Sequence, residues 1–328
     1  MISSTHKSYA LGVTGHPLGH SLSPRLHAAA LRATGLQGEY RLYPIPPLPA
    51  GQEALGALIA CLRDGRLDGL NVTIPHKQAV IPYLDDLTPL ALQIGAVNTI
   101  FRRGNRLVGD NTDAPGFMAD LYQHSPEARM PRSALVLGAG GSARAVVYAL
   151  LTAGWYVTIA ARRPEMAREI IAGSAFGDEQ CNGISLESLP ETIRKVEWMQ
   201  PEPHPPNTTS GYPAHSTPTL IVNTTPVGMH PELSHSPWPK DLPFPIGAFV
   251  YDLVYNPVEP LLVRDARSAG LKAASGLGML IEQAALAFER WTGVRPSIEA
   301  MRQAVTTTVK AVIDRPNTVH VEDPQFTG

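Results

Sequence analysis

A lysine and an aspartate each follow a predicted strand in the first third of the chain. Lys77 ends the segment NVTIPHK, and Asp113 ends the segment GDNTD. A carboxylate can hold an ammonium group and share its proton, so the two side chains together could act as a general acid and base. The simpler alternatives are a lysine that is only a solvated surface charge and an aspartate that only begins a helix. Their occurrence together favours the catalytic interpretation.

Short polar side chains precede the lysine and also follow the first predicted strand. Asn71 and Thr73 lie at the carboxyl end of a strand, where open α/β proteins bind ligands, so they could contact a polyol. Ser21 and Ser23 lie in HSLSP, before a helix, where two hydroxyls and the helix N–H groups could bind a carboxylate. Ser23 could instead serve only as the N-cap of that helix, with Pro24 in the first turn.

A glycine-rich turn follows the apolar strand ALVL. The segment GAGGSA at residues 138–143 fits the pattern G-x-G-x-x-G/A, and a helical pattern follows it. Gly138 permits a tight turn, Gly140 lets the backbone approach a pyrophosphate, and the small Ala143 lets the helix pack closely on the strand. A glycine turn without a ligand is the alternative, but the strand and the helix on either side favour dinucleotide binding.

Two arginines end the next predicted strand, about 20 residues beyond the glycine turn. Arg162 and Arg163 stand there, and no carboxylate precedes Glu165. NAD-binding turns usually place an acid at this point for the ribose hydroxyls, whereas NADP-binding turns offer arginine to the 2′-phosphate. The sequence therefore favours NADP as the cofactor, and a pair of solvated arginines at the end of a strand is the alternative.

Alternating strands and helices must position these residues. Three apolar β-rich runs between residues 9 and 74 alternate with two helical patterns, which indicates βαβ units and a mainly parallel sheet. Two short runs joined by Gly104 and Asn105 predict a hairpin, and a helix follows at about residues 112–122. From residue 134 on, a strand, a glycine turn, a helix and a second strand begin another α/β unit with its own buried sheet.

We therefore expect two α/β domains. Residues 1–112 form a substrate-binding and catalytic domain with a mainly parallel sheet, and residues 113–275 form a Rossmann-type domain that binds NADP. Two amphipathic helices over residues 276–314 return to the first domain, and residues 315–328 are a loose tail. Residues 197–218 carry many Pro, Ser and Thr without periodicity, which predicts a surface loop.

Composition excludes several classes of protein. The 328 residues include 27 Lys and Arg against 29 Asp and Glu, a net charge of −2, so the chain has no basic excess for nucleic acid. Cys61 and Cys181 lie far apart and form no ligand spacing, so we expect reduced thiols and no metal site. Without a signal-peptide pattern, the expected location is the cytoplasm and not a membrane. The apolar residues 145–161 are better explained as a buried helix followed by a buried strand than as a membrane span.

Eight motifs in one order resemble those of the shikimate dehydrogenase family over nearly the whole chain. They are HSLSP, NVTIPHK, GAVNT, GDNTD, GAGGSARA, VNTTPVGM, YDLVYNP and GLGMLIEQAA. The resemblance implies a cytosolic biosynthetic oxidoreductase that reduces 3-dehydroshikimate reversibly to shikimate with NADPH, in the pathway to chorismate and the aromatic amino acids.

The resemblance also implies a role for each matching residue. Lys77 and Asp113 would be the catalytic pair. The substrate would be bound by Ser21, Ser23, Asn71, Thr73, Asn98, Tyr255 and Gln283. NADP would be bound by Gly138, Ala139, Gly140, Gly141, Ser142, Arg162, Arg163, Leu253, Gly276 and Met279. The segment Ala161-Arg162-Arg163 replaces the family's usual Asn-Arg-Thr, and Met166 stands where the family often has another basic residue.

Two other functions remain as alternatives. A quinate/shikimate dehydrogenase would often use NAD and would place an aspartate near Pro164 for the adenosine ribose, which proline cannot replace. A nucleotide-sensing protein without catalysis would need neither Lys77 nor Asp113, and both are present. The expected partner is a small-molecule substrate, and the protein is a monomer or a homodimer, with family resemblance favouring the homodimer slightly.

Overall fold

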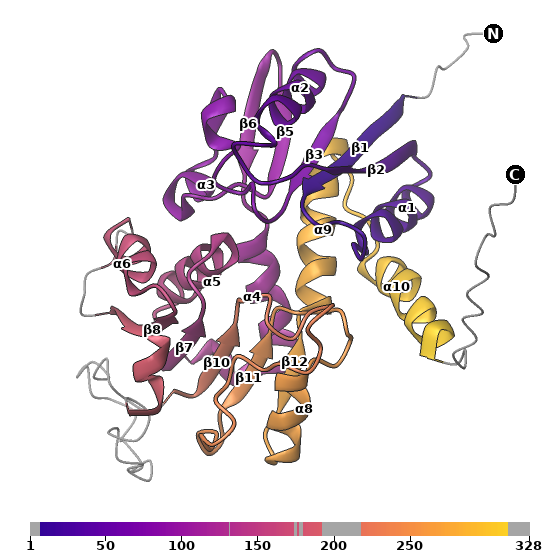
Figure 1. Ribbon diagram of the computed structural model, residues 1–328. Coiled ribbons are helices and arrows are strands. Elements are labelled where there is room, and N and C mark those ends of the chain that lie inside the picture. Colours follow the sequence, from indigo (N-terminus) through magenta and orange to yellow (C-terminus); the bar gives the residue numbers. More distant parts are fainter. Residues whose placement is uncertain (1–6, 131, 174–175, 177–179, 192–217, 314–328) are drawn as a thin grey trace, which may run out of the picture.

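The computed structural model describes residues 7–130, 132–173, 176, 180–191 and 218–313. The expected tail at residues 315–328 and nearly all of the expected loop at residues 197–218 lie outside the described residues. The described chain forms two six-stranded sheets with helices on their faces (Figure 1).

The first sheet is mainly parallel, as predicted. Its order is β2-β1-β3-β5-β6-β4, and β5 is the one strand that runs opposite to its neighbours β3 and β6. The antiparallel pair of β5 and β6 is the predicted hairpin. The strands are β1 (Ser8–Gly15), β2 (Gln37–Pro44), β3 (Gly69–Val72), β4 (Asp86–Leu87), β5 (Thr99–Arg103) and β6 (Arg106–Asp110). The accompanying helices are α1 (Ser23–Thr34), α2 (Gln52–Arg63), the short 3-10 turn η1 (Ile81–Tyr83) and α3 (Pro89–Ile94).

The second sheet is parallel throughout and has the strand order β12-β11-β10-β7-β8-β9. This is the doubly wound order of a Rossmann domain, in which the strand order reverses beside the first strand. The strands are β7 (Ser133–Leu137), β8 (Tyr156–Ala161), β9 (Cys181–Ser185), β10 (Leu220–Asn223), β11 (Phe249–Asp252) and β12 (Ala273–Ser275). The helices and the short 3-10 turn are α5 (Gly141–Thr152), α6 (Pro164–Ala172), η3 (Leu186–Ser188) and α8 (Leu261–Ser268).

The apolar stretch at residues 145–161 is the end of α5 followed by β8, as predicted. Val146, Leu150 and Ile159 are fully buried in the core of the second sheet, which explains the apolar character of the stretch. Within the described ranges, no helix has both the length and the apolar character needed to cross a membrane.

Two helices run between the sheets and connect them (Figure 1). The predicted helix after the hairpin is α4 (Asp113–His124), and the 3-10 turn η2 (Pro126–Arg129) follows it. Helix α4 packs tightly against α9 (Leu277–Thr292). The helices are so close that a side chain at Gly116 would overlap Gln283 and one at Gly278 would overlap Asp120. The missing side chains at these two glycines allow the close approach, which places Gln283 beside the first residues of α4.

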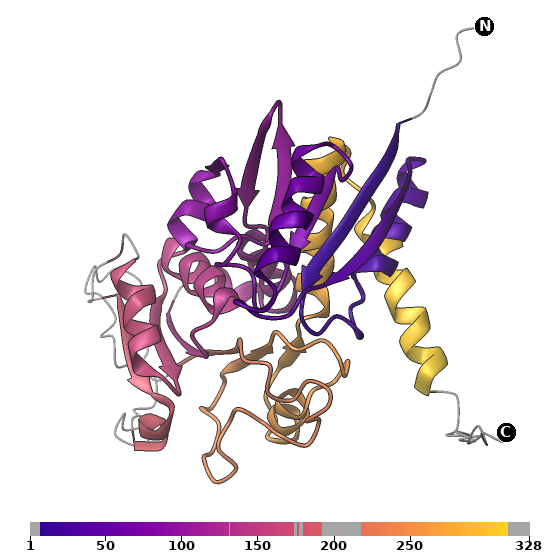
Figure 2. The ribbon, with the colours of Figure 1, turned by 45° about the horizontal axis from the view of Figure 1, so that its top comes forward.

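The C-terminal helices return to the first sheet, as predicted. Trp291 at the end of α9 donates a 3.0 Å hydrogen bond from its indole nitrogen to the carbonyl oxygen of Ile100 on β5. The last helix, α10 (Ile298–Ile313), lies beside α1 in both views (Figures 1 and 2). Met301 and Val305 of α10 share a buried cluster with Leu26 of α1. Burial of these apolar faces holds α10 against α1.

Candidate active site

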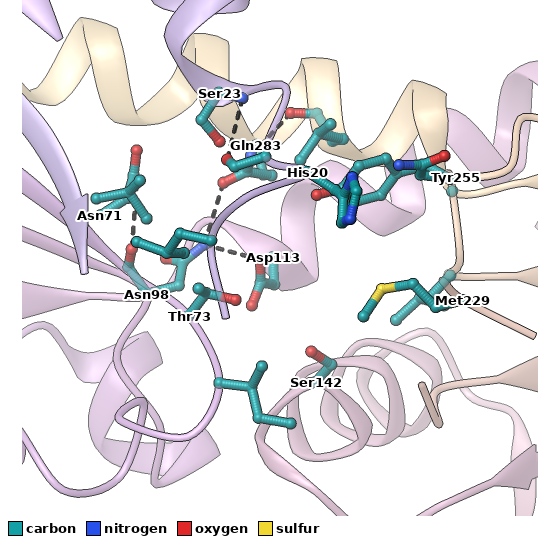
Figure 3. Close-up of a pocket in the computed structure, with 18 of the residues that line it drawn as sticks. His20, Ser23, Asn71, Thr73, Asn98, Asp113, Ser142, Met229, Tyr255 and Gln283 are labelled. Carbon is teal, nitrogen blue, oxygen red and sulfur yellow. Dashed lines mark hydrogen bonds between the residues drawn. The ribbon is translucent and has the colours of Figure 1, made fainter. Parts of the chain in front are cut away.

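A pocket of about 220 Å³ lies between the two sheets, where the turns after their strands meet. It brings together many of the residues that the motifs predicted (Figure 3). Those that line it are Ser21, Ser23, Asn71, Thr73, Lys77, Asn98, Asp113, Ser142, Leu253, Tyr255, Gly276, Met279 and Gln283. They come from both sheets and from α9, so the pocket depends on the arrangement of the whole chain.

Lys77 and Asp113 form an ion pair in this pocket. Lys77 lies in the turn after β3, and its ammonium nitrogen is 2.6 Å from Asp113 Oδ2. The two side chains are 12% and 7% exposed, so little water screens the pair. The same nitrogen donates a 3.0 Å hydrogen bond to Ser142 Oγ on α5. The expected pairing of an amine with a carboxylate is therefore present at the junction of the two sheets.

Asp113 is held in place by hydrogen bonds to both of its carboxylate oxygens. Lys77 occupies Oδ2, and Asn98 Nδ2 donates to Oδ1 over 2.8 Å. The backbone N–H of Asp113 donates to Asn111 Oδ1 over 3.0 Å. Asp113 is the first residue of α4, after Thr112 at the N-cap, so it also places a negative charge at a helix N-terminus. At this position Asp113 can both begin α4 and take part in catalysis.

Two asparagines extend the network from the ion pair into the first sheet. Asn98 Nδ2 also contacts Gln283 Oε1 at 3.3 Å, across the packed helices. Asn71 Nδ2 donates to the carbonyl oxygen of Asn98 and to Thr99 Oγ1, each over 3.2 Å. Asn71 Oδ1 accepts a 2.8 Å hydrogen bond from the Tyr40 hydroxyl. Because each amide has fixed partners, its donor and acceptor ends are oriented before any ligand binds.

Ser23 and Tyr255 lie at the opposite end of the pocket from Ser142 (Figure 3), and Ser21 also lines the pocket. Ser23 is the first residue of α1, and its backbone N–H donates to Ser21 Oγ over 3.3 Å. The N-cap is Leu22, so the alternative in which Ser23 serves only as the N-cap is wrong. Burial raises the pKa of the Tyr255 phenol. The phenol thus keeps its proton at neutral pH and can donate a hydrogen bond to a carboxylate.

The glycine turn has the form that a pyrophosphate site requires. Gly138 follows β7 with a positive φ of 106°, and a Cβ there would lie 2.7 Å from Thr224 Oγ1. A Cβ on Gly140 would have no atom within 4 Å, so the turn leaves open space at this glycine. Gly141 begins α5, whose free N–H groups favour an anion. These observations fit a dinucleotide phosphate.

Arg162 and Arg163 lie outside the pocket. They are exposed at the end of β8, where α6 begins with Pro164. This position next to the glycine turn in the strand order is where a Rossmann domain holds the adenosine ribose. The arginines are therefore accessible to a 2′-phosphate. Gly138, Ala139, Gly140 and Gly141 do not line the pocket either; they follow β7, the strand next to β8.

Comparison with known proteins gives consistent matches. Residues 13–100 match the family model described as the shikimate dehydrogenase substrate binding domain, and residues 276–306 match the model described as the shikimate 5'-dehydrogenase C-terminal domain. The shikimate dehydrogenase (NADP(+)) of Salinibacter ruber is 42% identical over 281 residues, which cover 85% of this chain and 90% of the relative. The chain belongs to the shikimate dehydrogenase family. The resemblance drawn from the eight motifs is thus confirmed.

Solved structures of the family share the fold. Shikimate 5-dehydrogenase from Thermus thermophilus, in complex with NADP(H) and shikimate, is 36% identical with a TM-score of 0.70, and the match covers 91% of this chain and 99% of that one. Quinate dehydrogenase from Corynebacterium glutamicum, in complex with NAD, is 29% identical with a TM-score of 0.74, covering 92% and 100%. The predicted two-part α/β fold of a shikimate dehydrogenase is confirmed.

Some pocket residues of this shikimate dehydrogenase family member were not predicted. Met229 and His230 line the pocket from the turn after β10, and the His230 ring lies 4.3 Å from the His20 ring of the first domain. Met229 ends the motif VNTTPVGM, so the motif could have indicated it. Tyr40 lies on an edge strand, and nothing in its surrounding sequence indicates that its hydroxyl binds Asn71.

Proposed function

We propose that this protein reduces 3-dehydroshikimate reversibly to shikimate with NADPH, with Lys77 and Asp113 as the catalytic pair. The observation that carries the proposal is the position of Lys77 Nζ, 2.6 Å from Asp113 Oδ2 and 3.0 Å from Ser142 Oγ. A proton-carrying group thus lies within hydrogen-bond distance of the turn that would bind the cofactor. Reduction of the ketone would supply shikimate for the biosynthesis of chorismate and the aromatic amino acids.

The ion pair donates a proton to the reacting oxygen or accepts one from it, depending on the direction of the reaction. In the reducing direction, Lys77 Nζ donates a proton to the oxygen at C3 as that oxygen gains negative charge. Asp113 Oδ2 holds the ammonium group in place. After the transfer, its negative charge favours the protonated amine, which regains its proton from solvent. In the oxidising direction, the pair accepts the proton of the C3 hydroxyl. Low exposure of both groups strengthens their interaction with the reacting oxygen.

The remaining polar side chains orient the ring. Ser21, Ser23 and Tyr255 at one end of the pocket would bind the carboxylate, because all three offer hydroxyl donors. The ring hydroxyls would contact Asn71, Thr73, Asn98 and Gln283, whose amide and hydroxyl groups both donate and accept hydrogen bonds. With its two ends bound in this way, the substrate would present C3 to Lys77.

The nicotinamide of NADP, when bound, supplies the carbon that donates or accepts the hydride. The glycine turn, residues 138–142, would bind the pyrophosphate through backbone N–H groups. Arg162 and Arg163 would bind the 2′-phosphate, because both are exposed and no acid stands before Glu165. Leu253, Gly276 and Met279 would form the apolar wall against the nicotinamide.

A four-way assay tests this proposal. Purified protein is mixed with shikimate or quinate, each with NADP or NAD, and formation of the reduced cofactor is followed by absorbance. We expect rapid reduction of NADP with shikimate and much slower reaction in the other three mixtures. Activity mainly with quinate and NAD would support the quinate dehydrogenase alternative. Silence in all four, with intact nucleotide binding, would support the sensor.

The division of the chain, the assembly and the location stay proposals. We place the substrate-binding domain at residues 1–112, the NADP-binding domain at residues 113–275 and the returning helices at residues 276–314. We further propose a cytoplasmic homodimer, with a monomer as the alternative. Size-exclusion chromatography with light scattering distinguishes the two assemblies.

A further inference from the structure

A buried carboxyl group and a buried amide meet at the edge of the second sheet that faces the pocket. Asp252 ends β11 and Asn223 ends the neighbouring β10, and both residues are fully buried. Asp252 Oδ1 accepts hydrogen bonds from Asn223 Nδ2 over 2.8 Å and from the backbone N–H of Val254 over 3.0 Å. Neither Asp252 nor Asn223 lines the pocket. Any effect of these two residues on the pocket must therefore act through the segments to which they are hydrogen-bonded.

The loop after β10 is attached to the amide. Asn223 Oδ1 accepts hydrogen bonds from the backbone N–H of Thr225 over 2.9 Å and from the Thr225 hydroxyl over 2.7 Å. Four residues further on, Met229 lines the pocket. The orientation of the Asn223 amide, which Asp252 fixes by accepting from its Nδ2, therefore determines where this loop starts.

The loop after β11 is attached to the same pair. The backbone N–H of Leu253 donates to the Asn223 carbonyl over 2.9 Å, and that of Val254 donates to Asp252. The next residue is Tyr255, which lies on the same side of the pocket as Met229 (Figure 3). Two successive backbone donors are thus fixed directly before the tyrosine.

The start of α9 forms the third attachment. The backbone N–H of Gly276 donates to the Val254 carbonyl over 3.2 Å, and a side chain at Gly276 would overlap the backbone of Leu253. Gly276 is the N-cap of α9, and Met279 in its first turn lines the pocket. Movement of Val254 would therefore move the start of α9.

We infer that Asp252 is a positioning residue, which holds the Met229 loop, the Tyr255 loop and the start of α9 in one arrangement around the pocket. The inference rests on the proposed function for what those three segments bind. Removal of the carboxyl group would leave two buried donors, on Asn223 and Val254, without an acceptor. Such donors are costly in a buried site, so the segments would shift to find other partners.

The chemistry of the carboxyl group provides a conservative variant. Burial raises the pKa of Asp252 to about 7, and the hydrogen bonds from Val254 and Asn223 oppose this only in part. Oδ2 is buried and has no hydrogen-bond partner among the described residues. Near neutral pH a carboxyl group with this pKa is about half protonated. Oδ1 accepts both hydrogen bonds, and an asparagine has nearly the same shape and keeps this oxygen. Asp252→Asn should therefore preserve the three attachments, whereas Asp252→Ala should not.

Steady-state kinetics, NADPH binding by fluorescence and thermal unfolding are compared for wild type, Asp252→Ala, Asp252→Asn and Thr225→Val. For Asp252→Ala we expect kcat/KM for shikimate to fall by about 10- to 100-fold and the Kd for NADPH to rise, because two buried donors lose their acceptor. Asp252→Asn should stay within about threefold of wild type, since its oxygen still accepts both hydrogen bonds. Thr225→Val removes the hydroxyl bond to Asn223 and the acceptor of the Val227 N–H, both at the start of the loop after β10. It should therefore weaken NADPH binding by roughly threefold to tenfold and leave KM for shikimate unchanged.

Leu62→Ala is the control for general destabilisation. Leu62 is fully buried on α2 in the core of the first domain, so its removal lowers stability through a cavity far from the three segments. An equal loss of kcat/KM in this variant at a comparable Tm would overturn the inference. Equal losses in Asp252→Ala and Asp252→Asn would also overturn it, because asparagine keeps the acceptor.

Two further outcomes remain decisive. If Asp252→Ala does not fold, Thr225→Val decides, and an unchanged Kd for NADPH in that variant contradicts the inference. If wild type does not turn over shikimate, the proposed function fails by itself. The NADPH affinities of the variants then still test whether Asp252 positions the pocket.

Discussion

Lys77 Nζ lies 3.0 Å from Ser142 Oγ, across the junction of the two sheets. Lys77 follows β3 of the first sheet, and Ser142 lies in the first turn of α5, the helix that follows β7 of the second sheet. Since Lys77 is also paired with Asp113, the contact joins the proposed proton-transfer group to the proposed pyrophosphate site. Proton transfer and cofactor binding therefore depend on the same relative position of the two sheets.

Loss of the lysine side chain should remove proton transfer and leave the fold intact. In Lys77→Ala, kcat should fall by about two to four orders of magnitude, the usual effect of losing a general acid–base group, while KM for shikimate changes little. Steady-state assays with shikimate and NADP measure both constants. The matched control is Lys240→Ala, because Lys240 is an exposed lysine of the second domain. Near-normal turnover in Lys77→Ala would remove this residue from the mechanism.

The cofactor preference should depend on Arg162. Because only NADP carries a 2′-phosphate, Arg162→Ala should weaken NADPH binding by roughly 10-fold and hardly affect NADH binding. Fluorescence titrations with both cofactors give the two affinities. The control for a change in net charge is Arg168→Ala, because Arg168 is an exposed arginine that lies on α6. If NADPH and NADH binding weaken equally, Arg162 does not recognise the phosphate.

Two glycines of the same turn should respond differently to a methyl group. Gly138→Ala forces a residue with a side chain into the left-handed region and against Thr224, so it should lower the free energy of unfolding by at least about 1–2 kcal/mol. Gly140→Ala meets no atom within 4 Å, so its stability should equal that of wild type.

The methyl group at Gly140 should instead occupy space that the pyrophosphate needs, so NADPH binding should weaken at unchanged Tm. Thermal unfolding and NADPH titration of both variants check this pair of expectations. Normal NADPH affinity in Gly140→Ala would show that the pyrophosphate does not approach the turn at this residue.

Acid stability should depend on a buried histidine. His27 is fully buried, and its ring stacks on Tyr40 at 4.2 Å. Burial lowers the pKa of His27 from its ordinary 6.5 to about 3, and the Asn71 amide opposes this only in part. Between these two values the unfolded chain binds a proton that the folded chain does not bind. The stability of the native state therefore falls as pH decreases below 6.5.

His27→Phe keeps the stacked ring and removes the titration. Between pH 6.5 and pH 5, wild type should lose about 1.6 kcal/mol more free energy of unfolding than His27→Phe. Urea unfolding at several pH values measures the difference, with the exposed His235→Gln as a control. Parallel pH profiles for wild type and His27→Phe would mean that His27 is protonated in the folded state.

The sequence by itself determined the strand–turn–helix units and the motifs at their ends. The glycine turn, the hairpin after β5 and the first residue of α4 all follow from local signals, because glycine conformation, side-chain alternation and helix starts depend on neighbouring residues. The carboxyl ends of parallel strands lie at one edge of a sheet, so the meeting of Lys77 with Asp113 could also be inferred. Co-linear motifs then indicated the family.

Only the tertiary structure decided which side chains far apart along the chain would touch. Asn98 contacts Gln283 over 185 residues of sequence because glycines let α4 and α9 pack closely. The hydrogen bonds that link Asp252 to Asn223, to the two loops and, through Val254, to the start of α9 likewise depend on strands β10 and β11 lying side by side in register. Each such contact depends on the packing of whole helices and sheets, and local sequence preferences do not specify that packing.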